Sequence, residues 1–148
     1  MGFLQWTLYY NNEKELDISG MVFKNFNYSD IQKKYGIEDD NFNVNALRSI
    51  FEENTTFLDA EIRGEANFKQ VSFISDANFN GVKFQNKVSF QEATFAGIAD
   101  FLNALFNDYA NYFGVRFTGK VSFNEAEFRG YSCFNDAILK EESFFILT

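Results

Sequence analysis

Large apolar residues recur at a regular spacing along the second part of the chain. Between residues 55 and 145, each of them closes a triplet that begins with a small residue and in most cases has a polar residue in the middle, as at residues 66–68 and 71–73. Successive large residues lie alternately five and six positions apart, so the repeating unit has eleven residues. Because alternate side chains of an extended chain point the same way, each triplet predicts a short strand that buries its first and last residues.

The position two places after each large residue predicts a corner between strands. Glycine occupies six of these seventeen positions, and polar residues occupy ten of the other eleven. Glycine adopts positive φ without strain, and Asp or Asn can bond its own backbone in a turn. A long helix is a poor alternative, because a five-residue step turns it by about 140° and would place the phenylalanines on two separate faces.

Four strands and four corners close a coil of twenty-two residues, so residues twenty-two apart are expected to stack. Adjacent coils would lie about 4.8 Å apart, with parallel backbone hydrogen bonds and stacked aromatic rings. The sequence thus predicts an all-β solenoid, a quadrilateral parallel β-helix of about four coils over residues 55–145. The expected interior columns are Phe73, Phe95, Phe117 and Leu139; Phe57, Phe79, Phe101, Phe123 and Phe145; Ile62, Phe84, Phe106 and Phe128; and Phe68, Phe90, Tyr112 and Phe134.

This rhythm of a small residue, a polar residue and a phenylalanine resembles the pentapeptide-repeat proteins, in particular those with phenylalanine-centred repeats and alternating steps of five and six. The resemblance covers roughly residues 55–145 and implies that the quadrilateral β-helix is right-handed. The sequence departs from the pattern where Thr55, Ser132 and Ser143 replace the small apolar residue and Tyr112 replaces phenylalanine. We expect the Tyr112 hydroxyl to find a partner near a corner, because an unpaired buried hydroxyl costs about 1–3 kcal/mol.

Residues 1–54 lack this rhythm and are predicted to form a cap over the first coil, whose open edge would otherwise recruit another chain. A capping-box pattern that begins at Ser29 predicts a helix over residues 29–36 that ends at Gly36. Residues 2–23 predict a β-hairpin, and a further turn of solenoid is the alternative.

A second helix is favoured over residues 43–53. Val44, Leu47, Ile50 and Phe51 would share one face of it. The same stretch also continues the phase of the triplets at residues 49–51, so a strand there is the alternative.

The end of the sequence is apolar. Phe144 and the short tail of residues 146–148, with Ile146 and Leu147, carry no polar cap. We expect an end-to-end homodimer through this edge. The alternative is that the tail folds over its own last coil.

Composition excludes several classes of function. The chain of 148 residues has no histidine, so no site can use an imidazole as ligand or base. Its single cysteine, Cys133, excludes an internal disulfide and fits a reducing, cytoplasmic location. The net charge of −8 opposes direct nucleic-acid binding. There is no apolar run of about 20 residues, so no membrane insertion is expected.

No catalytic, cofactor-binding or metal-binding residue is expected. The neighbouring glutamates at 61 and 65, 125 and 127, and 141 and 142 fall on outward or corner positions. Cys133 lies outward without a histidine to activate it. Phenylalanine fills the interior, so no cofactor cavity is predicted. If adjacent, the outward apolar residues would form a contact patch for a partner; besides Ile74, the candidates are Leu102, Leu105, Tyr109, Phe113 and Tyr131.

The function that this pattern favours is a non-enzymatic scaffold that presents a rigid, mildly acidic surface to a protein partner. The family resemblance implies an alternative, mimicry of DNA at DNA gyrase or another type II topoisomerase. Residues 55–145 carry twelve acidic and eight basic residues. Their net charge is about a third of that on about 20 Å of duplex DNA, which weakens this alternative. An enzyme is the remaining, least favoured class.

Overall fold

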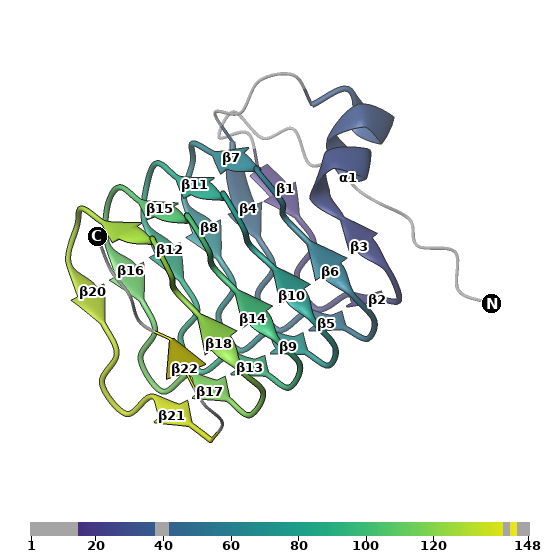
Figure 1. Cartoon of the computed structure of the whole chain (residues 1–148). Helices are drawn as coiled ribbons and strands as arrows, with labels where there is room; N and C mark the ends of the chain where they lie inside the picture. Colours follow the sequence, from purple (N-terminus) through teal and green to yellow (C-terminus); the bar gives the residue numbers. More distant parts are fainter. Residues whose placement is uncertain (1–14, 38–41, 141–142, 145–148) are drawn as a thin grey trace.

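The computed structural model describes residues 15–37, 42–140 and 143–144, and in this part the chain winds into a parallel β-solenoid (Figure 1). Its strands fall into four sheets, which we call A to D in the order in which the chain visits them. Strands β4 to β19 make four complete coils, with a partial coil before and after them. The predicted all-β solenoid is therefore confirmed.

The strands are short because each spans only the straight part of one face. Sheet A contains β1 (Glu15–Asp17), β4 (Asn43–Asn45), β8 (Ala66–Asn67), β12 (Val88–Ser89), β16 (Ala110–Asn111) and β20 (Ser132–Cys133). Sheet B contains β2 (Val22–Phe23), β5 (Ile50–Phe51), β9 (Ser72–Phe73), β13 (Thr94–Phe95), β17 (Arg116–Phe117) and β21 (Ile138–Leu139). Sheet C contains β3 (Phe26–Asn27), β6 (Thr55–Thr56), β10 (Ala77–Asn78), β14 (Ala99–Asp100), β18 (Val121–Ser122) and β22 (Ser143–Phe144). Sheet D contains β7 (Glu61–Ile62), β11 (Lys83–Phe84), β15 (Leu105–Phe106) and β19 (Glu127–Phe128).

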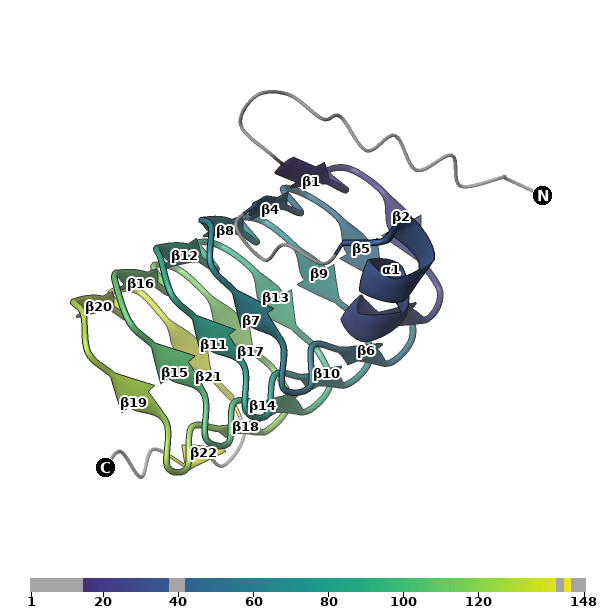
Figure 2. The same ribbon diagram turned by 90° about the horizontal axis from the view of Figure 1, so that it is seen from above.

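Neighbouring coils are in the predicted register of twenty-two residues. Ala77 pairs with Ala99, and Phe95 pairs with Phe117, both in parallel. The backbone carries this pairing into the corners, since the Phe79 N–H donates to the Asp100 carbonyl oxygen at 2.7 Å. Sheets A and C lie on opposite sides of the rod, as Figures 1 and 2 show.

The interior columns are those that the sequence predicts. Consecutive rings within a column have centroids 4.4 to 5.5 Å apart and are inclined by 3° to 22°. Rings of neighbouring columns meet edge to face, as Phe101 does with Tyr112 at 5.9 Å. Leu139 keeps its register opposite Phe117 but is 40% exposed in the last coil, and Phe145 lies outside the described residues.

The alternating steps of five and six residues correspond to two kinds of corner. Short corners follow sheets A and C and are β-turns, in which the N–H of Ala104, for example, donates to the carbonyl of Phe101 at 3.1 Å. Their third residue has positive φ, which explains a residue such as Asn103 (φ 55°) there. Long corners follow sheets B and D. In one of them a Cβ on Gly119 would clash with the carbonyl oxygen of Gly97 in the preceding coil, so this glycine permits close backbone approach.

The solenoid begins well before residue 55, which corrects the predicted boundary of the cap at residue 54. The helix predicted over residues 43–53 is wrong, because β4 and β5 occupy this stretch and pair with β8 and β9. Val44 and Phe51 are buried, whereas Ile50 is exposed, so the triplet phase and not the helical face decides the structure. Pairing with the next coil satisfies the backbone of this segment and overrides its helical pattern.

The hairpin predicted over residues 2–23 is also corrected where the structure describes it. β1 and β2 belong to different sheets, and each pairs in parallel with the following coil instead of with the other. Residues 15–23 therefore form the alternative, a further turn of solenoid. The remainder of that prediction, residues 2–14, lies outside the described residues.

Helix α1 (Tyr28–Tyr35) lies one residue earlier than the helix predicted over residues 29–36. Its N-cap is Asn27, whose side chain accepts hydrogen bonds from the N–H groups of Ser29 and Asp30, so Ser29 is not the cap. Gly36 ends the helix in the left-handed conformation, as expected.

The helix takes the place of a sheet D strand in the first coil. It follows β3, and sheet D begins one coil later with β7. Tyr28 and Ile31 are buried, and the Tyr28 ring stacks on Phe57 at 5.3 Å. α1 thus covers one side of the interior at the N-terminal end of the rod (Figure 2).

Truncation of a ring in the middle of a column tests the packing. Phe101 is fully buried between Phe79 and Phe123, so Phe101→Ala should lower the free energy of unfolding by about 3–5 kcal/mol through loss of contacts and a residual cavity. Denaturant unfolding measures this loss. Lys83→Ala, at an exposed position, should change stability by less than about 0.5 kcal/mol. A loss below about 1 kcal/mol for Phe101→Ala would contradict the assigned core.

The two kinds of corner should respond differently to substitution of glycine. Gly119→Ala should destabilise the protein by about 1–3 kcal/mol, because the added Cβ meets the backbone of Gly97 and the coils must move apart. Gly114→Asn should lower the free energy of unfolding by less than about 1 kcal/mol. Asparagine tolerates the positive φ of this position (63°), and the surroundings leave room for the added Cβ. Thermal and denaturant unfolding of the two variants compares the corners, and equal losses would show that they do not differ.

Candidate interaction surface

The outward side of sheet C carries an open groove of about 360 Å³. The groove crosses β6, β10 and β14. The outward-facing residues of these strands, Thr56, Asn78 and Asp100, are the middle residues of their triplets and lie side by side in register. The residues that line the groove are Asn54, Thr55, Thr56, Asp76, Ala77, Asn78, Ile98 and Asp100.

Backbone hydrogen bonds fix the polar side chains of this groove. Asn78 Oδ1 accepts from the N–H of Asn80 at 2.9 Å, and Asp100 Oδ1 accepts from the N–H of Leu102 at 3.0 Å. Asp76 Oδ1 accepts from the N–H of Ile98 in the next coil at 2.8 Å. The two carboxylates are therefore held in place by the solenoid backbone before any partner arrives.

The bonds of Asn78 and Asp100 belong to a pattern that sequence reasoning missed. In sheets A and C, the middle residue of a triplet accepts the N–H of the residue two places later and so begins the short corner. The recurrence of Asn, Asp, Ser or Thr every eleven residues is the signal that could have revealed it. The residues that make this bond are Asn45, Thr56, Asn67, Asn78, Ser89, Asp100, Asn111 and Ser122.

Acidic charge gathers on the same side of the rod. We define the acidic face as strands β6, β10, β14 and β18 of sheet C with the two residues on either side of each triplet, that is residues 53–59, 75–81, 97–103 and 119–125. Five acidic residues and one basic residue lie on it, whereas the rest of residues 42–140 carries seven acidic and eight basic residues. The members of the acidic face that carry charge are Glu53, Asp59, Asp76, Asp100, Lys120 and Glu125.

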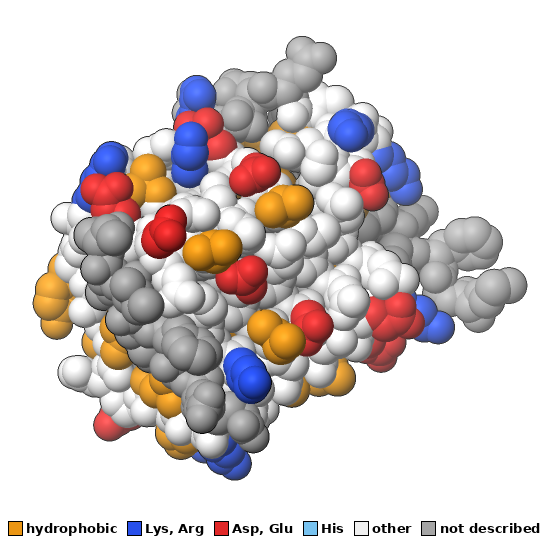
Figure 3. Space-filling view, viewed as in Figure 1, with side chains coloured by type: hydrophobic (Ala, Val, Ile, Leu, Met, Phe, Trp, Pro, Cys, Tyr) orange, Lys and Arg blue, Asp and Glu red, His pale blue; other side chains and the backbone are white. Residues whose placement is uncertain are grey.

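Aliphatic side chains lie among these carboxylates. Leu58 is 51% exposed and Ile98 is 50% exposed, and Leu102 is partly exposed on the same face. Figure 3 shows hydrophobic and acidic side chains side by side on this side of the molecule. The acidic face therefore offers both apolar contact and negative charge.

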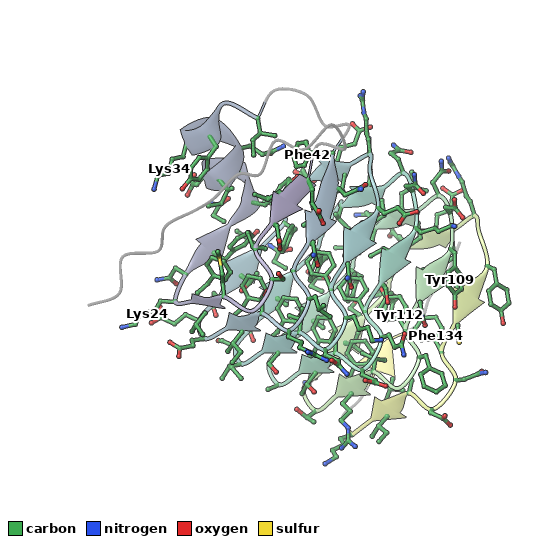
Figure 4. The ribbon with its side chains drawn as sticks, turned by 180° about the vertical axis from the view of Figure 1, so that it is seen from behind. Lys24, Lys34, Phe42, Tyr109, Tyr112 and Phe134 are labelled. Carbon is green, nitrogen blue, oxygen red and sulfur yellow. The ribbon has the colours of Figure 1, made fainter. Side chains whose placement is uncertain are left out.

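The predicted contact patch is divided among several faces. Leu102 lies at the corner after β14, Leu105 lies on β15 of sheet D, and Phe113 lies at the corner after β16. Tyr109 and Tyr131, at the corners before β16 and β20, are in contact, with ring centroids 5.6 Å apart and an angle of 17° (Figure 4 labels Tyr109). Partner binding by these five residues stays a prediction.

Cys133 lies beside the tyrosine pair. Partial burial raises the pKa of Tyr109, and the neighbouring Cys133 and Tyr131 raise it further. The thiol is partly exposed and occupies the middle of its triplet, where the earlier coils have an oxygen acceptor.

The predicted dimer edge is described only in part. Phe144 belongs to β22, which pairs with β18 at the end of sheet C. Its side chain, Ile146 and Leu147 lie outside what the structure describes. An end-to-end homodimer stays a prediction.

The carboxylates of sheet D form ordinary surface ion pairs. Arg63 Nε lies 3.2 Å from Glu61 Oε1, and hydrogen bonds from Gln85 and Arg63 lower the pKa of Glu61. Arg129 Nε lies 2.8 Å from Glu127 Oε1. Among the described residues, no group of three or more Cys, Asp or Glu side chains is placed to hold a metal ion, and no helix has the length and apolar character to cross a membrane.

The expected partner for the Tyr112 hydroxyl is absent from the described part of the chain, so that prediction is wrong. The ring stacks between Phe90 and Phe134 and is fully buried (Figure 4). Its hydroxyl lies among apolar rings and has no hydrogen-bond partner among the described residues. The phenol fills the place of a phenylalanine because its shape suits the column, although its polar group is not satisfied.

Comparison with known proteins supports the assignment of the repeat. A family model described as pentapeptide repeats, in nine copies, matches residues 79–126. The predicted resemblance is thus confirmed over these residues, where the solenoid is built from pentapeptide repeats. No curated protein and no solved structure matches the chain.

Removal of the buried hydroxyl should stabilise the protein. Tyr112→Phe should raise the free energy of unfolding by about 1 kcal/mol, because the hydroxyl loses its bonds to water on folding and gains none. Denaturant unfolding measures the change, and Tyr131→Phe at a 72% exposed position is the control that should change little. A clear loss of stability in Tyr112→Phe would mean that the hydroxyl is paired.

The same residue predicts sensitivity to alkaline pH. Burial raises the pKa of Tyr112 well above its ordinary value of 10.0, so the fold holds the neutral phenol. Ionisation of this phenol leaves stability unchanged below pH 10. As the pH rises from there toward the folded-state pKa, the free energy of unfolding falls, because the unfolded chain ionises first. The free energy of unfolding of the wild type should therefore fall more steeply above pH 10 than that of Tyr112→Phe. Parallel slopes would contradict this linkage.

Proposed function

We propose that this protein is a non-enzymatic scaffold that binds a protein partner through its acidic face. The observation that carries the proposal is the concentration of charge, since the acidic face has five acidic residues against one basic residue while the rest of residues 42–140 is nearly balanced. Charge on one face of a rod orients a partner and speeds its approach.

The interior supports a scaffold in preference to an enzyme. Aromatic rings fill the coils from Phe51 to Phe123 with almost no exposure. Catalysis by carboxylates needs a pair with opposed environments in a cleft. Glu61 and Glu127 of sheet D lie instead on an open surface, and each forms an ion pair with an arginine.

Capture of a partner from an extract of the source cell tests the proposal. The intact protein, the double variant Asp76→Asn/Asp100→Asn, and the control Glu65→Gln/Asp108→Asn are immobilised and compared. Each variant removes two negative charges, and Asn keeps the oxygen that accepts the backbone hydrogen bond at Asp76, Asp100 and Asp108.

We expect the wild type and the control to capture the same protein, and the acidic-face variant to capture it about tenfold less. The capture should also weaken as salt rises from about 50 mM to about 500 mM. Equal loss in both variants would mean that net charge, and not the acidic face, is recognised. That result would overturn the proposal.

Mimicry of DNA at a type II topoisomerase is the second candidate, and the one-sided charge favours it. The density of charge opposes it, because duplex DNA carries one charge per about 1.7 Å. The four segments that make up the acidic face carry together a net charge of only −4. We expect no change in supercoiling by purified DNA gyrase at a large excess of the protein. Inhibition that disappears in Asp76→Asn/Asp100→Asn would favour mimicry instead.

A further inference from the structure

The groove on sheet C places one exposed apolar side chain, Ile98, next to two carboxylates of adjacent coils. Asp76 and Asn78 lie in one coil, and Ile98 and Asp100 lie above them in the next. The exposed side chain of Ile98 thus has the Asp76 carboxylate in the coil below it and the Asp100 carboxylate two residues farther along its own coil.

This arrangement complements a long basic side chain. Such a side chain has an aliphatic stem, which can pack on an isoleucine, and a charged head that a carboxylate can bind. Arginine fits better than lysine because its planar guanidinium donates to two acceptors at once in a fixed geometry. Asn54 and Thr56 continue the groove into the preceding coil, and Leu58 provides a second exposed aliphatic contact on the same face.

We propose that this groove binds an extended, arginine-bearing segment of a protein, with aliphatic residues next to the arginines. The inference rests on the proposed function and names the chemistry of the partner at that surface. The groove and its exposed aliphatic side chains provide the contact surface, and the charge of the acidic face repels nucleic acid and attracts a basic chain. The stem of the arginine lies along Ile98, and its guanidinium lies between Asp76 and Asp100.

A defined peptide tests the inference without a natural partner. The probe is a fluorescent peptide of alternating arginine and leucine, and its binding to the intact protein is followed by fluorescence anisotropy. The first control peptide has citrulline, which keeps the shape of arginine without its charge, and the second has serine in place of leucine. Amide chemical shifts report whether the peptide touches Asn78, Ile98 and Asp100.

The expected result is binding that weakens about tenfold with the citrulline peptide and clearly with the serine peptide. Asp76→Asn/Asp100→Asn and Ile98→Ser should each weaken it similarly, and Glu65→Gln/Asp108→Asn should not. Shift changes should centre on the groove. Equal binding of the arginine and citrulline peptides, or equal loss in the control variant, would overturn the inference.

The two proposals fail in distinguishable ways. If the peptide does not bind but capture from the extract still depends on Asp76 and Asp100, the scaffold function holds and the inferred partner chemistry is wrong. If the peptide binds but no protein is captured through the acidic face, the groove has the inferred chemistry and the proposed function is wrong.

Discussion

Two distances coincide in this solenoid, and the rest of the structure depends on their match. Parallel strands hydrogen-bond at about 4.8 Å, and aromatic rings stack at nearly the same spacing. Rings of successive coils, such as Phe57, Phe79 and Phe101, are accordingly 4.9 Å apart and almost parallel. The backbone and the core therefore reinforce each other at every coil, and short strands are enough to fill a narrow interior with aromatic rings.

The sequence was sufficient to predict this interior but not the N-terminal end of the described chain. The phase of Ala66, Phe68 and the following triplets determines which residues are buried, because one error of phase would expose every ring. Residues 43–53 satisfy both a helical and a triplet pattern, and only pairing with β8 and β9 selects the strands. The hydroxyl of Tyr112 was mispredicted because the sequence does not reveal whether any polar group reaches the centre of the core.

The groove could not be predicted, because it depends on how outward residues of different coils adjoin. Asp76 and Asp100 are twenty-four residues apart and carry no shared motif. The positions of the two carboxylates follow from the register of the coils and from the hydrogen bond that each carboxylate accepts from a backbone N–H group. The five candidate patch residues are spread over several faces for the same reason, since among them only Tyr109 and Tyr131 are separated by a whole coil of twenty-two residues. Residues near in sequence, such as Leu102 and Leu105, fall on different faces.

The register also constrains how such a protein can grow by duplication. A duplicated stretch of twenty-two residues adds one coil and leaves every later residue on its own face, so the acidic face would simply lengthen. A duplicated stretch of eleven residues preserves the inward phase and the core equally well. It moves all later residues by half a coil, however, and exchanges sheet A with sheet C. The two events are alike for folding, but the second would divide the acidic face between opposite sides of the rod.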